Sequence, residues 1–138
     1  MPLKIYRELE IGSDFFQAKQ AEDEIVAAAG AYNYGEEVIF ALRLSLEEAL
    51  SNAIRHGNVG DAAKRVHIRY AIDADRIDIT VRDEGGGFDP ASIPDPTAAE
   101  NLENPSGRGI MLMRAYMNKV EYNPKGNQVR LVKMHRAG

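Results

Sequence analysis

Two alternating segments joined by three residues place the strongest constraint on the fold. Residues 65–72 alternate apolar with polar side chains, and residues 76–82 repeat the pattern after Asp73-Ala74-Asp75. A period of two predicts strands that bury one face and expose the other. A short polar connection between two such strands predicts an antiparallel hairpin. The chain must therefore cover one face of an antiparallel sheet with other elements.

Helical periodicity elsewhere supplies that cover. Apolar residues recur at helical spacing in residues 15–29, 36–58 and 110–117. Ser13 or Asp14 can cap the first of these helices, and Gly57 is expected to cap the end of the second. Further strands are predicted at residues 3–11, 119–122 and 128–134. Because the elements do not form βαβ units, we predict an α+β fold, a two-layer sandwich whose mostly antiparallel sheet carries helices on one face.

Composition excludes several classes of protein. The 138 residues suit one domain, and the absence of cysteine excludes disulfides, thiolate zinc sites and cysteine nucleophiles. The N-terminus lacks the apolar stretch of a signal peptide, and no apolar run approaches the ~20 residues of a membrane helix. The net charge is −4, with scattered basic residues, which argues against direct nucleic-acid binding. We expect a single cytoplasmic domain over residues 1–138, with no membrane partner.

The helix at residues 42–58 carries an unusual polar pair. Glu48 and Asn52 are four residues apart, so their side chains lie one above the other beside the apolar stripe. A carboxylate can take a proton, and a carboxamide oxygen is a hard ligand that suits magnesium. The alternative is a solvated glutamate followed by a helix-capping asparagine. Asparagine is a poor residue inside a helix, because its side chain competes for backbone hydrogen bonds.

Two glycine clusters follow this helix. Asp83 ends a predicted strand before Gly85-Gly86-Gly87, where the backbone can approach a ligand closely and the carboxylate can accept from an amine such as that of adenine. Ser106-Gly107-Arg108-Gly109 leads into the last helix, where free N–H groups favour an anion and Arg108 suits phosphate. Each cluster alone is also compatible with an ordinary glycine-rich turn or a plain loop-to-helix junction.

The segment between the clusters, residues 90–106, is polar, contains four prolines and shows no period. A loop of this length in a compact domain is a functional lid or a disordered segment. We expect residues 91–106 to act as a lid that orders when nucleotide binds. The second cluster is not a Walker A loop, because no Gly-Lys-Ser/Thr follows, and it lacks the third glycine and preceding strand of a Rossmann fingerprint.

Together the three motifs resemble the N, G1 and G2 boxes of the GHKL (Bergerat-fold) ATPases. They occur in that order on a helix, a strand end and a lid–helix junction. Within this superfamily, the closest resemblance is to the anti-sigma-factor serine/threonine kinases of the sporulation and general-stress type. It rests on Glu-Ala-Leu-Ser-Asn-Ala-Ile-Arg-His-Gly from position 48, Val-Arg-Asp-Glu-Gly-Gly-Gly-Phe from position 81 and Gly-Arg-Gly-Ile-Met-Leu-Met-Arg from position 107.

The resemblance implies a role for each motif residue. Glu48 would be the general base that takes a hydroxyl proton, and Asn52 would ligate the magnesium that bridges the phosphates. Asp83 would read the adenine amine. His56 could contact the ligand or act as a helix-terminal cation; a phosphoacceptor role is disfavoured, because histidine kinases of the superfamily carry their acceptor on a separate dimerisation helix. The residues expected to bind ATP are Asn52, His56, Asp83, Gly85, Gly87, Gly107, Arg108, Gly109 and Ile110.

The activity implied by the resemblance is that of an ATP- and Mg²⁺-dependent anti-sigma factor kinase. Such a protein binds a sigma factor and phosphorylates a small anti-anti-sigma (STAS) protein on serine or threonine, and a homodimer is expected by analogy. The alternatives are a non-catalytic nucleotide-binding module and a detached histidine-kinase catalytic domain. Glu48 argues against the first alternative, since a pure binder needs no base there. The length, with no acceptor domain, argues against the second.

Overall fold

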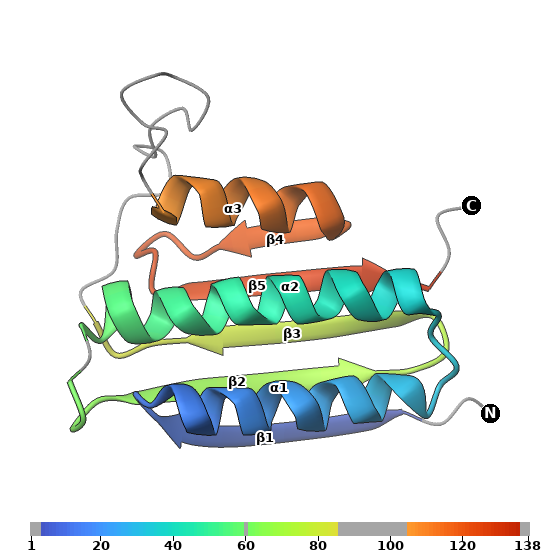
Figure 1. Cartoon of the computed structure of the whole chain (residues 1–138), viewed down its shortest axis with the longest axis horizontal. Coiled ribbons are helices and arrows are strands. Elements are labelled where there is room, and N and C mark those ends of the chain that lie inside the picture. The colour runs from blue at the N-terminus through green and yellow to red at the C-terminus, as the bar shows by residue number, and fades with distance from the viewer. Residues whose placement is uncertain (1–3, 60, 86–104, 136–138) are drawn as a thin grey trace.

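The computed structural model describes residues 4–59, 61–85 and 105–135. Within these ranges the chain forms three helical segments over a sheet, and the second helix ends in a π-helical turn (Figure 1). No helix in the described part of the chain is both long enough and apolar enough to span a membrane. The elements in chain order are β1 (Ile5–Gly12), α1 (Phe15–Gly30), α2 (Glu36–Asn52), η1 (Ala53–Gly57), β2 (Arg65–Ile72), β3 (Arg76–Arg82), α3 (Pro105–Tyr116), β4 (Lys119–Tyr122) and β5 (Gln128–Met134).

The strands form one antiparallel sheet in the order β1-β2-β3-β5-β4. In the β2–β3 hairpin, Ile68 lies opposite Val81 and Tyr70 lies opposite Ile79. Ile79 in turn lies opposite Leu131 of β5. All five side chains are buried, so the alternation in the sequence does place one face of each strand in the core. Both predicted hairpins and the predicted edge strand are confirmed.

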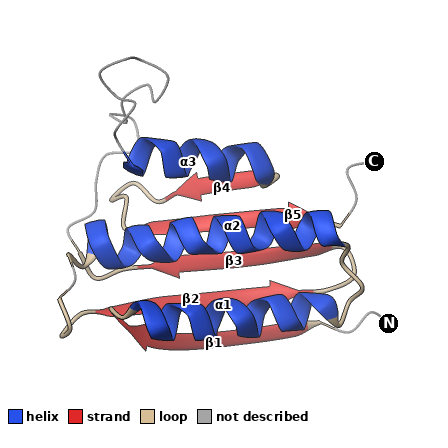
Figure 2. Ribbon diagram, in the orientation of Figure 1, coloured by secondary structure: helices blue, strands red, loops and turns tan. Residues whose placement is uncertain are grey.

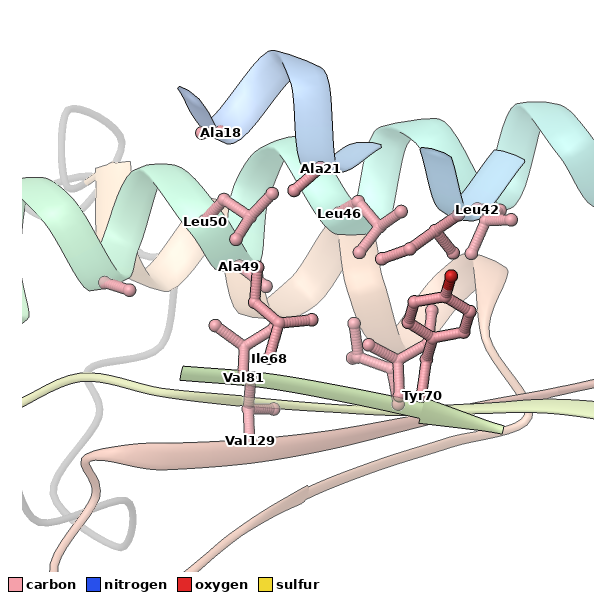
Figure 3. Packing of buried hydrophobic residues seen from close by; sticks show 14 of the residues in the cluster. Ala18, Ala21, Leu42, Leu46, Ala49, Leu50, Ile68, Tyr70, Val81 and Val129 are labelled. Atoms are coloured by element: carbon pink, nitrogen blue, oxygen red, sulfur yellow. The ribbon is translucent and has the colours of Figure 1, made fainter. Parts of the chain in front are cut away.

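Helix α2 lies along the middle of the sheet and supplies the centre of the core. Leu42, Leu46 and Leu50 recur every four residues, and each is at most 2% exposed. Figure 3 shows them between the side chains of the sheet and those of α1, where Ala18 and Ala21 allow the helices to approach closely. Burying a leucine side chain contributes about 1.5–3 kcal/mol. Figure 2 shows the helices on one face of the sheet, which confirms the predicted two-layer α+β fold.

The junction between β1 and α1 resolves the question of the first helix cap. Asp14 is the N-cap, and its Oδ1 accepts the Phe16 N–H at 2.8 Å. Ser13 instead donates from its Oγ to the carbonyl oxygen of Lys64 at 2.7 Å. It therefore ties the start of α1 to the segment that leads into β2.

Helix α3 begins earlier than the sequence predicted, at Pro105 rather than Ile110. Proline suits the first helical position, because its fixed φ and missing N–H cost nothing there. Gly107 and Gly109 consequently lie inside the first turns of the helix and not in front of it. Glycine inside a helix costs about 1 kcal/mol relative to alanine, so these two positions need a packing or functional reason.

Candidate functional site

The three motif regions meet at one end of the molecule. Figure 1 shows the C-terminal end of α2, the end of β3 and the start of α3 at the same end of the sheet. The antiparallel sheet and the direction of α2 place them there, although they are far apart in the sequence. A ligand that touched all three elements would lie across this end.

Glu48 and Asn52 lie where α2 meets α3. A Cβ added to Gly109 would be 2.5 Å from Glu48 Oε2 and 3.4 Å from Asn52 Nδ2. The first distance is shorter than real Cβ contacts, so a side chain at position 109 would require the flexible Glu48 carboxylate to shift, whereas glycine leaves the carboxylate in place. Both side chains on α2 are partly exposed and can be reached by a ligand. The structure thus brings these three predicted site residues together.

Asp83 is the first residue after β3, and its side chain is only 8% exposed. Its Oδ1 accepts the Gly85 N–H at 2.8 Å. Burial raises the pKa of Asp83 above its ordinary value, while the hydrogen bond from Gly85 acts in the opposite direction. A carboxylate held in a buried place by the backbone is a strong acceptor for a donor that a ligand brings.

Gly57 and Gly85 make room for this carboxylate. A Cβ on Gly57 would overlap the carboxyl group of Asp83, and one on Gly85 would overlap the carbonyl oxygen of Gly57. The prediction that Gly57 caps the helix is wrong: it is the last residue of η1, and the cap is Asn58 with φ −85°. Glycine is required at position 57 for space. Sequence reasoning missed this role, because a contact between distant segments leaves no local pattern.

The π-helical turn changes how α2 ends. The Asn58 N–H donates to the carbonyl oxygen of Ala53 at 2.8 Å, five residues back instead of four. A wider turn alters the direction in which the following residues leave the helix, and π turns are frequent at functional sites. The turn places the backbone of Gly57 in contact with the Asp83 side chain.

The turn that carries Asp83 is anchored from two sides. The Asp83 N–H donates to Asn127 O at 2.9 Å, and Asn127 Nδ2 donates to Asp83 O at 3.2 Å. On the other side, the Glu84 carboxylate accepts the Arg65 N–H at 3.0 Å and lies 2.7 Å from His67 Nε2. The hydrogen bond with His67 holds the pKa of Glu84 below its ordinary value. Sequence reasoning assigned no function to these anchoring residues.

The remaining predicted residues fall into two groups. His56 is exposed in η1, and Ile110 is 3% exposed with its side chain in the core, so a ligand could meet Ile110 only through the backbone. Gly107 lies in the first turn of α3, where backbone N–H groups have no acceptor within the helix. Gly87, residues 91–104 of the lid predicted at residues 91–106, and the side chain of Arg108 lie outside the described residues or their described side chains. The last two residues of that predicted lid belong to α3 instead.

Asn52 is the residue best suited to hold a metal ion. Its carboxamide oxygen is a hard ligand, and it stands one helical turn from the Glu48 carboxylate. Among the described residues, no group of three His, Asp or Glu side chains could hold a metal without other ligands. A magnesium ion here would take most of its ligands from water and from phosphate oxygens, as magnesium usually does beside nucleotides.

Asp83 lies at one end of this site, and Glu48 and Asn52 lie at the other. Glu48 and Gly57 are nine positions apart: the α-helical part from Glu48 to Asn52 spans roughly 6 Å at 1.5 Å per residue, and the π-helical turn follows it. Asp83, packed against Gly57, offers a buried acceptor for an amine at one end. Glu48, Asn52 and the first turn of α3 offer a base, a metal ligand and free N–H groups at the other. The arrangement can hold an elongated ligand with an amine at one end and phosphates at the other.

Comparison with known proteins agrees with this geometry. Residues 13–133 match the histidine kinase-like ATPase domain. The chain is 28% identical over 85 residues to the serine/threonine-protein kinase BtrW of Bordetella bronchiseptica, a match that covers 60% of each protein. It is 29% identical over 101 residues to the serine-protein kinase RsbW of Oceanobacillus iheyensis, covering 69% of this chain and 64% of that kinase.

A third relative is named as an anti-sigma factor and not as a kinase. The chain is 35% identical over 88 residues to the anti-sigma F factor of Bacillus thuringiensis, covering 62% of this chain and 60% of that protein. These matches span under two thirds of the length of each relative. The family match, by contrast, covers all three helices and, apart from β1 and the last residue of β5, the sheet. The chain belongs to the histidine kinase-like ATPase domain family.

Proposed function

We propose that the chain is an ATP-dependent protein serine/threonine kinase that acts as an anti-sigma factor. It binds a sigma factor and phosphorylates an anti-anti-sigma protein of the STAS type, and so regulates transcription without touching DNA. The observation that carries the proposal is Glu48, a carboxylate next to Asn52 and against Gly109 at the start of α3. The names of the relatives, which are kinases and an anti-sigma factor, support it.

In this proposal ATP lies along the end of α2. The adenine amine donates to Asp83, with Gly85 and Gly87 giving the base room to approach. The phosphates lie near Asn52 and the first turn of α3, where free N–H groups and the helix dipole favour negative charge. Magnesium, when bound, neutralises the phosphate charge, and Asn52 is the residue that would hold it.

The transfer step assigns Glu48 a single task. The hydroxyl oxygen of the substrate serine or threonine bonds to the γ-phosphorus, and the bond from that phosphorus to the oxygen of ADP breaks. Glu48 takes the hydroxyl proton. The rest of the site positions the reactants and balances charge, which is the larger part of catalysis in phosphoryl transfer.

A nucleotide-binding module without transfer is the main alternative. Such a module needs the adenine site at Asp83 but has no use for a carboxylate beside the phosphates. The position of Glu48 against Gly109 therefore favours the kinase. By analogy with relatives, we expect the kinase to work as a cytoplasmic homodimer.

A reconstitution with purified partners tests the proposed function. The chain is mixed with the sigma factor and with the STAS protein encoded near its gene, in the presence of ADP or ATP with Mg²⁺. We expect the chain and the sigma factor to co-elute in size-exclusion chromatography, and we expect unphosphorylated STAS protein to displace the sigma factor. Separate elution under every nucleotide condition would contradict the anti-sigma assignment.

Replacing Asn52 by alanine tests the metal site. We expect Mg²⁺-dependent ADP binding to weaken by about 10- to 100-fold, because one interaction of a charged partner is worth about 1.5–3 kcal/mol. Calorimetry with Mg²⁺ and with a chelator separates the metal from the nucleotide: the wild type should lose affinity in the chelator and the variant should change little. Ser51→Ala, on the adjacent helical position, is the matched control. A variant that keeps the full response to Mg²⁺ removes Asn52 from this role.

The raised pKa of Asp83 makes a prediction about pH. Burial favours the protonated carboxyl group, and a protonated Asp83 accepts the adenine amine less well, so the affinity for ADP should fall as pH is lowered from neutral. The stability of the protein without nucleotide should depend on pH in the opposite direction. The folded chain holds this proton more tightly than the unfolded chain, so the stability that Asp83 contributes is present below the unfolded pKa and lost as pH rises through the folded pKa.

Calorimetry of ADP binding at a series of pH values checks this. Asp83→Asn is the control, because it removes the titration of Asp83 and leaves that of the phosphates. The wild type should show an additional loss of affinity toward acid pH. Identical pH profiles for the two proteins would show that Asp83 does not bind the nucleotide as a charged group.

A further inference from the structure

Asn58 is completely buried at the end of η1, and its side chain makes three hydrogen bonds. Its Nδ2 donates to Ser13 Oγ at 3.0 Å and to the carbonyl oxygen of Arg65 at 2.9 Å. Its Oδ1 accepts the Glu84 N–H at 2.7 Å. The carboxamide therefore uses both its nitrogen donor and its oxygen acceptor within the protein, and the residue is not exposed to solvent.

These bonds join four segments of the chain. Ser13 precedes α1, Arg65 begins β2 and Glu84 follows β3, while Asn58 itself ends the helical run that carries Glu48 and Asn52. The bond to Glu84 is the one nearest the nucleotide site. Glu84 lies between Asp83 and Gly85, which form the buried acceptor, and Asp83 packs against Gly57, the residue before Asn58.

The backbone after Asn58 is held in a conformation that the chain would not choose freely. Val59 has φ 52°, in the left-handed region that β-branched residues rarely adopt. Such strain persists only where the surroundings enforce it, and it gathers at functional sites. Asn58 directly precedes this residue, and its buried carboxamide would be costly to leave without its hydrogen-bond partners.

We propose that Asn58 is a positioning residue for adenine recognition. Its Oδ1 fixes the Glu84 amide, and so fixes where the turn of Asp83 and Gly85 lies relative to Gly57 and the end of α2. The inference rests on the proposed function in one respect, the assignment of the adenine amine to Asp83. It adds a residue that never touches the nucleotide and yet sets how well the protein distinguishes adenine from other bases.

Base selectivity separates positioning from a purely structural role. The probes are ADP and inosine diphosphate. In inosine diphosphate a carbonyl oxygen replaces the amine whose hydrogen bond Asp83 would accept. We expect Asn58→Ala to lower the ratio of ADP affinity to inosine diphosphate affinity by about tenfold, the worth of roughly one well-placed hydrogen bond to a charged group. Calorimetry gives both affinities, and thermal unfolding of the same samples reports stability.

Two matched variants make the test specific. Asn58→Asp keeps the acceptor for the Glu84 amide but loses the donors, and Ser13→Ala removes a partner of Asn58 on the side away from Glu84. Both should lower the melting temperature and keep the ADP preference. If Asn58→Ala fails to fold, Asn58→Ser takes its place, because the shorter hydroxyl cannot reach the Glu84 amide.

The outcomes are distinct. A preference lost in Asn58→Ala, or in Asn58→Ser, and kept in Asn58→Asp and Ser13→Ala supports the inference. A preference that falls in all the variants in step with their melting temperatures assigns Asn58 a structural role and overturns it. If Asp83→Asn abolishes the preference while Asn58→Ala and Asn58→Ser keep it, only the inference about Asn58 fails. If Asp83→Asn keeps the preference, the adenine assignment fails and the inference with it.

Discussion

Replacing Glu48 by alanine is expected to slow phosphoryl transfer to the STAS protein by a factor on the order of 10²–10⁴, the usual contribution of a positioned base. The lower end is expected, because phosphoryl transfer depends more on positioning and charge than on proton removal. The affinity for ATP should stay nearly unchanged, since the carboxylate meets the incoming hydroxyl and not the nucleotide. Single-turnover kinetics give the transfer rate, and calorimetry gives the affinity.

The neighbouring glutamate is the matched control for this experiment. Glu47 precedes Glu48 on α2, but its side chain is exposed, and the buried carboxylate beside it is Glu22 of α1. Glu47→Ala should therefore transfer phosphate at the wild-type rate. Glu48→Gln keeps the shape of the side chain without its basicity and should resemble Glu48→Ala. A wild-type rate in Glu48→Ala would refute the assignment of Glu48 as base.

Asp83→Asn is expected to weaken ADP binding by about 10- to 100-fold. The change replaces a charge-assisted acceptor by an amide, which loses about 1.5–3 kcal/mol. The protein without nucleotide should not lose stability, and should gain some at neutral pH, because burial opposes the charge of Asp83 in the folded state. An asparagine oxygen can still accept the Gly85 N–H that Asp83 Oδ1 accepts.

Calorimetry of ADP binding and denaturant unfolding test the two halves of this prediction. Asp75→Asn is the control, since that exposed residue lies in the β2–β3 connection at the opposite end of β3. It should change neither quantity much. Equal ADP affinity in the wild type and Asp83→Asn would remove Asp83 from the adenine site. A loss of affinity accompanied by a large loss of stability would point to misfolding instead.

The parts of the fold that sequence predicted are those with a local physical cause. Alternating side chains in β2 and β3 and the four-residue spacing of Leu42, Leu46 and Leu50 each follow from burial of one face. A polar cap before α1, at Ser13 or Asp14, follows from the same local hydrogen bonding, and the structure shows that Asp14 makes it. These causes act within a few residues, so a short stretch of sequence contains them.

The sequence pattern predicts that α3 starts at Ile110, five residues after its actual start at Pro105, and the difference has a physical reason. Proline and two glycines favour turns over helices in a local reading, yet Pro105 begins the helix and Gly107 and Gly109 lie inside it. Tertiary packing decides this case, because Ile110 and Met113 of α3 are buried in the hydrophobic core. A preference of about 1 kcal/mol per glycine is smaller than what the packing of a whole helix supplies.

Sequence reasoning found the residues expected to touch the nucleotide but not those that hold them in place. Glu48, Asn52 and Asp83 carry functional groups whose chemistry is visible in one dimension. The roles of Gly57 and Asn58 depend on segments that meet only after folding, namely the end of η1 and the turn after β3. No periodicity or spacing announces such a contact, so the structure was needed to assign them.

Direct detection of transferred phosphate tests the central claim. The purified chain, ATP and Mg²⁺ are incubated with the STAS protein, and intact-mass spectrometry with peptide mapping follows the STAS protein over time. The kinase assignment predicts one phosphate on a single serine or threonine, formed with the wild type and with Glu47→Ala and greatly slowed with Glu48→Ala. A STAS protein that stays unmodified while the wild type binds ATP tightly would contradict the kinase and leave a nucleotide-binding module.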